Sequence, residues 1–182
     1  AVNNIVADQI YAGVLSNEGE ALKLIDSAGT VVDSVGKEGE AWPAGSSIGK
    51  ISMERITALN AGDIASNWKS FTGNQSAKDA SGNFINGTPK ASNSVVTVVV
   101  TGSGGGGGGA QTPSPSLSPS PDPSSPLLKV VINEIAWMGT ATSSNDEWLE
   151  LHNTTDQTID LTGWTLKSLT GASPDPQITL SG

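Results

Sequence analysis

Hydrophobic residues in the first part of the chain come in short runs that small and polar residues separate. The apolar pairs within residues 14–35 are Ala21-Leu22, Leu24-Ile25 and Val31-Val32. Turn-forming residues occupy positions 17–19, before the first of these pairs, and 26–29, between the second and the third, and each of these turns contains a glycine. No helical spacing of three and four persists over ten residues. The pattern predicts short antiparallel strands joined by tight turns, in which glycine supplies the positive φ.

Strand-like alternation continues up to residue 94. Residues 42–45 (WPAG) predict a turn with a large aromatic side chain at its base. Residues 51–56 (ISMERI) alternate in the period of two that is typical of a strand. Trp68 and Phe71 precede a loop that is rich in glycine and asparagine. We therefore expect residues 1–94 to be rich in β-structure and dense in turns.

The last part of the chain carries longer strand patterns. Residues 129–137 (KVVINEIAW) and 147–153 (EWLELHN) have β-branched or aromatic residues on both faces, which is typical of strands inside a sandwich. The small and polar residues 139–146 predict a surface loop between them. Residues 160–169 (DLTGWTLKSL) predict another strand with a β-bulge at Gly163, and residues 178–180 begin a further one.

A segment of low complexity separates the two parts. Residues 102–126 read GSGGGGGGAQTPSPSLSPSPDPSSP, glycine first and then proline alternating with serine. Such a segment buries too little apolar surface to offset an ordering entropy of roughly 1–2 kcal/mol per residue. We expect a disordered Gly/Pro/Ser linker over residues 95–128, between one unit at 1–94 and another at 129–182.

Composition excludes several classes of protein. Eighteen acidic residues against nine basic ones give a net charge of −9, which argues against nucleic-acid binding by this chain itself. The absence of cysteine excludes disulfides and thiolate metal sites. The longest apolar run, residues 95–100 (VVTVVV), is far shorter than the roughly 20 residues that a membrane-spanning helix needs.

The strand motifs on both sides of the linker resemble the lamin tail domain, especially its bacterial extracellular members. Residues 131–169, with INEIAW, NDEWLELHN and DLTGWTLK, resemble the opening half of such a domain. Residues 14–94, with LSNEGEALKLID, GTVVDSV, WPAG, ISMERI and NGTPKASNS, resemble the closing half. The closing half comes first in the chain. This order indicates an excerpt from a tandem array, which holds the end of one repeat and the start of the next.

The resemblance implies an all-β, immunoglobulin-like antiparallel β-sandwich that is incomplete and circularly permuted in order. It also implies a structural or binding module without catalytic activity, such as a spacer or adhesion domain of a secreted or cell-surface multidomain protein. The alternative is an accessory domain of a secreted nuclease or phosphatase whose catalytic domain lies outside this chain. A calcium- or glycan-binding module is a third reading. The expected partner is a protein or a surface glycan, and no cofactor is expected.

The two halves are expected to dock on each other, because neither can cover its own apolar strands. Pairing within one chain competes with head-to-tail pairing between chains.

Acidic residues form the densest set of charged candidates. They are Glu134, Asp146, Glu147, Glu150, Asp156 and Asp160. Carboxylates of this kind serve as calcium ligands or as an acid/base pair, but no calcium-loop motif is present. We expect surface positions or structural hydrogen bonds for them. His152 is the only histidine, so it lacks the partners of a zinc site or a catalytic triad. No residue is predicted to be catalytic, cofactor-binding or metal-ligating.

Aromatic residues and the single arginine are the remaining candidates. The five tryptophans are Trp42, Trp68, Trp137, Trp148 and Trp164. Exposed tryptophans could stack on sugars or bases, but their places in strand-like segments favour packing between the sheets. Arg55 is predicted to pair with a carboxylate or a carbonyl oxygen. The glycine run at 104–109 lacks the lysine and the strand–helix context of a phosphate loop.

Overall fold

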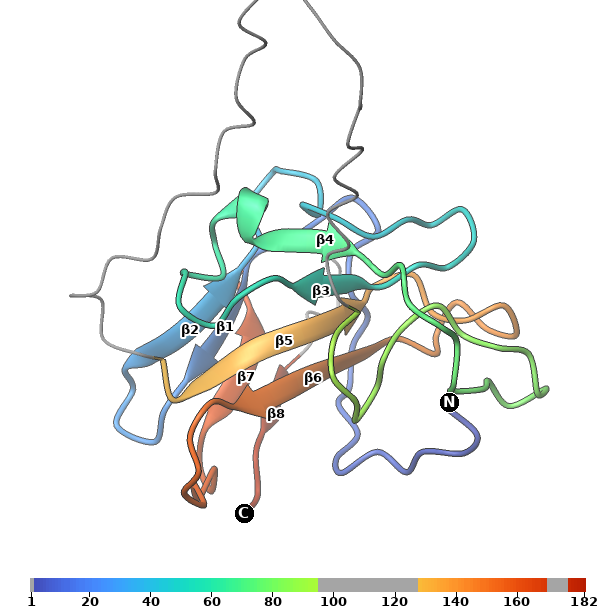
Figure 1. Ribbon diagram of the computed structural model, residues 1–182. Coiled ribbons are helices and arrows are strands. Elements are labelled where there is room, and N and C mark those ends of the chain that lie inside the picture. The colour runs from blue at the N-terminus through green and yellow to red at the C-terminus, as the bar shows by residue number, and fades with distance from the viewer. Residues whose placement is uncertain (1, 95–127, 170–176) are drawn as a thin grey trace, which may run out of the picture.

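Strands form where the short apolar runs predict them, and they build two antiparallel sheets (Figure 1). The computed structural model describes residues 2–94, 128–169 and 177–182. The strands in this part of the chain are β1 (Leu22–Ile25), β2 (Val31–Val35), β3 (Met53–Arg55), β4 (Trp68–Ser70), β5 (Val130–Ala136), β6 (Trp148–Asn153), β7 (Thr165–Ser168) and β8 (Gln177–Thr179). A short 3-10 helix, η1 (Ala65–Asn67), precedes β4. The predicted antiparallel β-sandwich is confirmed.

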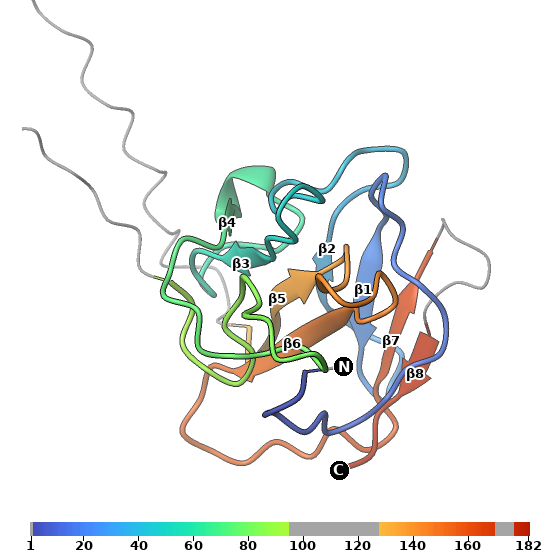
Figure 2. The same cartoon turned by 90° about the vertical axis from the view of Figure 1, so that its right-hand side faces the viewer.

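Each sheet contains strands from both sides of the low-complexity segment. The first sheet has the order β2-β1-β7-β8 and the second has the order β4-β3-β5-β6. Figure 2 shows them as two layers. β1 pairs with β7 from Leu22↔Ser168 to Ile25↔Thr165, and β3 pairs with β5 at Met53↔Ile135 and Glu54↔Glu134. Residues 2–94 and residues 128–182 are therefore interleaved in one sandwich.

The β1–β2 hairpin follows directly from its turn residues. Asp26 Oδ1 accepts hydrogen bonds from the backbone N–H groups of Ala28 at 2.9 Å and Thr30 at 2.8 Å. Gly29 has a φ of 86°, which an L side chain rarely adopts. The Asp26 side chain and this glycine reverse the chain, and Leu22 and Leu24 are then fully buried on one face of β1.

Three features differ from the sequence-based expectations. β4 was not predicted, because only three residues, Trp68–Ser70, pair with β3. The prediction that residues 147–153 form an interior strand is wrong, because β6 is the outer strand of its sheet and its side chains are half-buried or exposed. The bulge predicted at Gly163 is also wrong. That glycine, with a φ of 79°, lies in the turn before β7, whose register with β1 and β8 is regular.

The core fills the space between the two sheets with side chains from both segments. Its buried members include Leu15, Leu22, Leu24, Val35, Trp42, Met53, Trp68, Val130, Ile132, Ile135, Trp137 and Leu166. The rings of Trp42 and Trp137 are stacked with centroids 6.5 Å apart. Trp42 Nε1 donates a hydrogen bond to the carbonyl oxygen of Ser16 at 2.6 Å, which satisfies the polar end of this aromatic side chain.

A buried ion pair joins the sheets. Arg55 of β3 contacts Asp33 of β2 with an Nη1–Oδ2 distance of 2.5 Å, and both side chains are 1% exposed. Arg55 Nη1 also donates to the carbonyl oxygen of Ile132 on β5 at 3.1 Å, and the Ile132 N–H donates to Asp33 at 2.8 Å. The predicted carboxylate partner of Arg55 is thus Asp33.

Two further expectations concern the linker and membrane-spanning helices. The linker predicted at 95–128 lies outside the described residues, apart from Leu128. Among the described residues no helix is long and apolar enough to cross a membrane.

Truncation of the core tryptophans tests the packing. Trp42→Ala should lower the free energy of unfolding by about 3–5 kcal/mol, because the indole is 8% exposed and stacks on Trp137. Trp164 is only partly buried against the core, so Trp164→Ala should cost less, about 1–3 kcal/mol. Urea denaturation measures both changes. Ile48→Ala, at a residue that is 86% exposed, is the control and should leave the midpoint unchanged. Unchanged midpoints in both tryptophan variants would contradict the assignment to the core.

Candidate functional site: an open groove and a buried carboxylate pair

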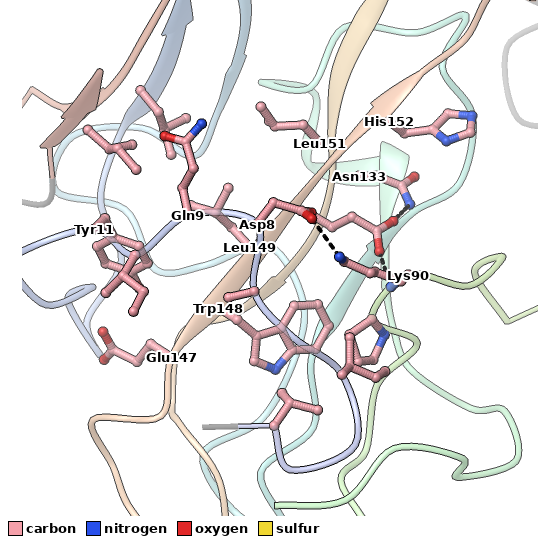
Figure 3. Close-up of a pocket in the computed structure, with 18 of the residues that line it drawn as sticks. Asp8, Gln9, Tyr11, Lys90, Asn133, Glu147, Trp148, Leu149, Leu151 and His152 are labelled. Atoms are coloured by element: carbon pink, nitrogen blue, oxygen red, sulfur yellow. Dashed lines mark hydrogen bonds and ion pairs between the residues drawn. The ribbon is translucent and has the colours of Figure 1, made fainter. Parts of the chain in front are cut away.

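A groove lies on the side of the sandwich where β6 and the segment around β8 are the outermost elements. Its volume is about 1520 Å³, and its lining includes parts of the N-terminal segment (residues 2–13), of β6, and of residues 177–182 in and after β8, which we call the β8 region. The N-terminal segment is tied to the β8 region, because Gln9 Nε2 donates to the carbonyl oxygen of Ser181 at 2.9 Å and Ala12 forms a bridge with Gln177. We call this feature the edge groove. Figure 3 shows part of its lining.

The floor of the edge groove is apolar. Leu149 and Leu151 of β6 and Ile178 and Leu180 of the β8 region are only partly buried, although they pack against the core. Val6 and Ile10 of the N-terminal segment also line the groove and are 84% and 90% exposed. An outer strand beside an apolar hollow is the arrangement that accepts an added strand or another elongated ligand.

The polar rim of the groove is held by contacts between distant parts of the chain. Lys90 forms an ion pair with Asp8 at 2.6 Å, and its backbone N–H donates to Glu150 Oε2 at 2.6 Å. Asn133 Nδ2 donates to Glu150 Oε1 at 2.7 Å. The Lys90–Asp8 pair is exposed, so it adds little to stability. Glu150 instead ties the 86–94 loop to β5 and β6.

Glu147 lies at one end of the groove beside Tyr11 (Figure 3). Glu147 Oε2 accepts a hydrogen bond from the Leu15 N–H at 2.7 Å. The pKa of Glu147 is raised to about 7, mainly by burial. The Leu15 N–H and the charge of Lys50 oppose this shift, and the charge of Glu20 adds to it. Burial, followed by the charges of Glu147 and Glu20, raises the pKa of Tyr11 above its ordinary value. Glu147 therefore anchors the backbone at Leu15.

A second candidate is a pair of glutamates that face each other across two strands. Glu54 of β3 and Glu134 of β5 are directly paired in the sheet register, and neither is exposed. Residues 86–94 run close to both carboxylates. Thr88 and Ser94 from this loop, together with Ser52 and Lys69, supply their hydrogen bonds.

One hydroxyl group bridges the two carboxylates. Thr88 Oγ1 lies 2.8 Å from Glu54 Oε1 and 2.8 Å from Glu134 Oε2. A hydroxyl carries a single hydrogen, so it donates a hydrogen bond to one of these oxygens and accepts a hydrogen bond from the other carboxyl group, which must then be protonated. Burial raises the pKa of Glu134 to about 7, against the opposing hydrogen bonds from Ser52 and Thr88. Glu134 is thus the carboxyl group that holds the proton.

Glu54 is the ionised member of the pair. Burial by itself would raise its pKa, but the Lys69 ammonium group and the hydrogen bonds from Ser94 and Thr88 outweigh this effect and lower the pKa below its ordinary value. Lys69 forms the ion pair with Glu54. In enzymes, two neighbouring carboxyl groups with well-separated pKa values often serve as a general acid and a general base. Here both are inaccessible to solvent, and their oxygens accept hydrogen bonds that hold the 86–94 loop against the sheet.

The structure scatters the acidic residues that the sequence singled out. Glu134 is in the buried pair, and Glu147 and Glu150 both line the edge groove. Asp146 accepts from Thr140 Oγ1 at 2.9 Å, Asp156 from Gln157 Nε2 at 3.1 Å, and Asp160 from the Thr162 N–H at 2.9 Å. Across residues 2–94, 128–169 and 177–182, no three His, Cys, Asp or Glu side chains form a group that could hold a metal ion.

His152 and the tryptophans occupy the positions expected for strand and core residues. His152 is an exposed residue of β6 that pairs with Val131 and lines the edge groove. Trp42, Trp68 and Trp137 are buried, whereas Trp148 and Trp164 are partly buried against the core. Trp148 is the one tryptophan among the residues that line the groove.

Two functional groupings were missed by the sequence analysis. Glu54 was recognised only as part of an alternating strand, and its partner Glu134 is 80 positions away, so only the β3–β5 pairing brings the two together. The N-terminal segment was not assigned to any site. The available sequence signal was the occurrence of two large apolar residues, Val6 and Ile10, on either side of the polar residues Asp8 and Gln9. Both apolar side chains are exposed in the structure.

Comparison with known protein families matches residues 123–179 to the lamin tail domain, an immunoglobulin-like family without catalytic activity. The described part of this range contains β5, β6, β7 and β8. The resemblance that the sequence motifs indicated is confirmed for this segment, and that of residues 14–94 to the closing half of a repeat stays a prediction. No curated protein and no solved structure matches the chain.

The pH dependence of stability tests the buried pair. The pKa values of Glu134 and Glu147 are raised to about 7 from an ordinary value of 4.5, so between these pH values the folded chain binds more protons than the unfolded chain. Stability should therefore be greatest near pH 4.5 and should fall as the pH rises to 7. Below that window the lowered pKa values of Glu54 and Asp79 act in the opposite direction.

Glu134→Gln should flatten this decline, because the substituted side chain takes up no proton on folding. Urea denaturation at several pH values between 5 and 8 measures the slope. Glu38→Gln, at an exposed glutamate in the turn after β2, is the matched control and should keep the wild-type slope. A Glu134→Gln variant with the same slope as wild type would show that Glu134 is ionised throughout this range.

Proposed function

We propose that this chain is a non-catalytic binding and spacer module of a secreted or cell-surface multidomain protein. The observation that carries the proposal is the contrast between the two candidate sites. The buried carboxylates are committed to hydrogen bonds that hold the fold, whereas the edge groove combines an outer strand, an apolar floor and exposed Val6 and Ile10. The groove thus has the features of a binding surface.

The remaining support comes from the family and the composition. Residues 123–179 match the lamin tail domain, which is an immunoglobulin-like family. Immunoglobulin-like sandwiches commonly serve as spacers and binding modules. A low-complexity segment rich in Gly, Pro and Ser, together with a net charge of −9, is typical of a soluble unit within a longer array. The ligand that fits this proposal is an extended protein segment or a surface glycan, which lies along the edge groove.

Absence of hydrolysis is the first test of the proposal. The purified chain should not turn over DNA, phosphate esters or polysaccharides, because its buried carboxyl groups do not reach solvent. Release of product is followed over time with each of the three substrates. Turnover that Glu134→Gln or Glu147→Gln abolishes, and that Glu38→Gln preserves, would overturn the proposal in favour of an enzyme.

Binding at the edge groove is the second test. The wild-type chain is applied to a glycan array alongside a Val6→Asp/Ile10→Asp double variant. Both residues are exposed, so the fold should persist while binding of any retained glycan drops at least about tenfold, since charged side chains are poorly accommodated on an apolar floor. Ile48→Asp, at an exposed residue outside the groove, is the control and should bind as wild type. Retained binding by the groove variant would place the ligand elsewhere.

A further inference from the structure

The strand pairing between residues 2–94 and residues 128–182 has the character of an interface between two molecules. β1 would be an edge strand without β7, and β3 would lack its neighbour β5. Four Cα pairs join β1 to β7, from Leu22↔Ser168 to Ile25↔Thr165. The pairs Met53↔Ile135 and Glu54↔Glu134 join β3 to β5. Each segment therefore completes both sheets of the other.

Buried polar groups are also satisfied across this interface. The Arg55–Asp33 ion pair lies in one segment. In the other segment, the backbone N–H of Ile132 donates to Asp33 and its carbonyl oxygen accepts from Arg55. In the reverse direction, Glu134 accepts a hydrogen bond from Ser52 Oγ at 2.5 Å and from the Thr88 N–H at 2.9 Å. Separation of the segments would leave both sets of groups without these partners. Buried polar groups that lose their hydrogen-bond partners are costly in free energy. The interface between the two segments therefore favours this one arrangement of its strands.

Further contacts spread over the whole interface. Lys50 Nζ donates to the carbonyl oxygen of Met138 at 2.6 Å, and Trp137 Nε1 donates to that of Ala44 at 3.2 Å. Trp42 stacks on Trp137. The fully buried side chains Leu22, Leu24 and Met53 of the first segment share one core with Ile132 and Ile135 of the second.

We propose that a second copy of this chain is a binding partner, because residues 128–182 of one copy fit residues 2–94 of another through this same interface. Reciprocal exchange of the segments gives a closed dimer with two complete sandwiches, and one-way exchange gives head-to-tail chains. Pairing within one chain dominates in dilute solution, and exchange between copies grows with concentration. The chain is thus a self-complementary connector as well as a module.

Complementation between two defective full-length chains tests this proposal. One chain carries Leu24→Asp and Met53→Asp, which damage the first segment and leave residues 128–182 intact. The other carries Ile132→Asp and Leu166→Asp, which damage the second segment and leave residues 2–94 intact. All four residues are buried in the shared core, so neither chain should form its own sandwich. The two chains are unfolded in urea, mixed in equal amounts and refolded by dilution.

In the mixture, residues 2–94 of one variant and residues 128–182 of the other can form one intact sandwich for every two chains. We therefore expect a cooperative unfolding transition with about half the wild-type amplitude per chain. Light scattering should give the mass of a dimer that contains one copy of each variant. Each variant refolded alone should show no such transition. A mixture that behaves as the sum of its separate components would overturn the proposal.

The matched control mixes Leu24→Asp/Met53→Asp with a chain that carries Leu22→Asp and Val35→Asp. Both members of this pair are damaged in residues 2–94, so no intact first segment is present and no transition should appear. A transition in this control of the same size as in the complementing mixture would also overturn the proposal, because folding would then not depend on exchange. The outcome does not depend on any ligand of the edge groove, so it is separate from the tests of the proposed function.

Discussion

A buried ion pair between Arg55 and Asp33 connects three strands of the sandwich. It joins β3 of one sheet to β2 of the other, and through the Ile132 peptide it also holds β5. Arg55 further donates to the carbonyl oxygens of Thr57 and Asn60 and lies over the ring of Trp68, 5.9 Å from its centroid. Removal of one charge would leave the other uncompensated in the interior, which typically costs about 3–5 kcal/mol. The irregular register of β5 between Ile132 and Glu134 occurs where this strand meets the ion pair.

The neighbouring residue Glu54 forms a second buried polar cluster on the opposite face of the same strand. Side chains alternate along a strand, so Arg55 points between the sheets and Glu54 points toward the 86–94 loop. The three residues of β3 are all buried, which requires that every charge among them has a partner. Lys69, Thr88 and Ser94 supply those partners for Glu54. The very short strand β3 is thereby held by polar contacts on both of its faces. Glu54 and Glu134 resemble an acid/base pair, but their hydrogen bonds hold the 86–94 loop against the sheet.

The edge groove has the opposite physical character. β6 has no strand on its outer side in the described part of the chain, and the apolar residues beside it are only partly covered by the N-terminal segment. That segment is held at both of its ends, by Gln9 to Ser181 and the Ala12–Gln177 bridge near β8 and by the Val2–Asp79 bridge at its start. The edge groove, where we propose that a ligand binds, thus lies where apolar residues of the sandwich are only partly covered. The interface between the two segments, in contrast, is closed by paired strands and buried charges, which suits recognition of another copy.

Local patterns in the sequence are enough to predict most of the strands of this protein. Short apolar runs at Leu22–Ile25 and Val31–Val35 predict strands, and Gly29 allows the tight turn between them. Val130–Ala136 is predicted as a strand because it has β-branched residues on both faces. The motifs of the last segment also carry the resemblance to the lamin tail domain. Tertiary structure alone decided that Glu54 meets Glu134, that Arg55 meets Asp33, and that β6 is an outer strand. These outcomes depend on which strands become neighbours, and strand order is set by the joint burial of both segments, which no local pattern encodes.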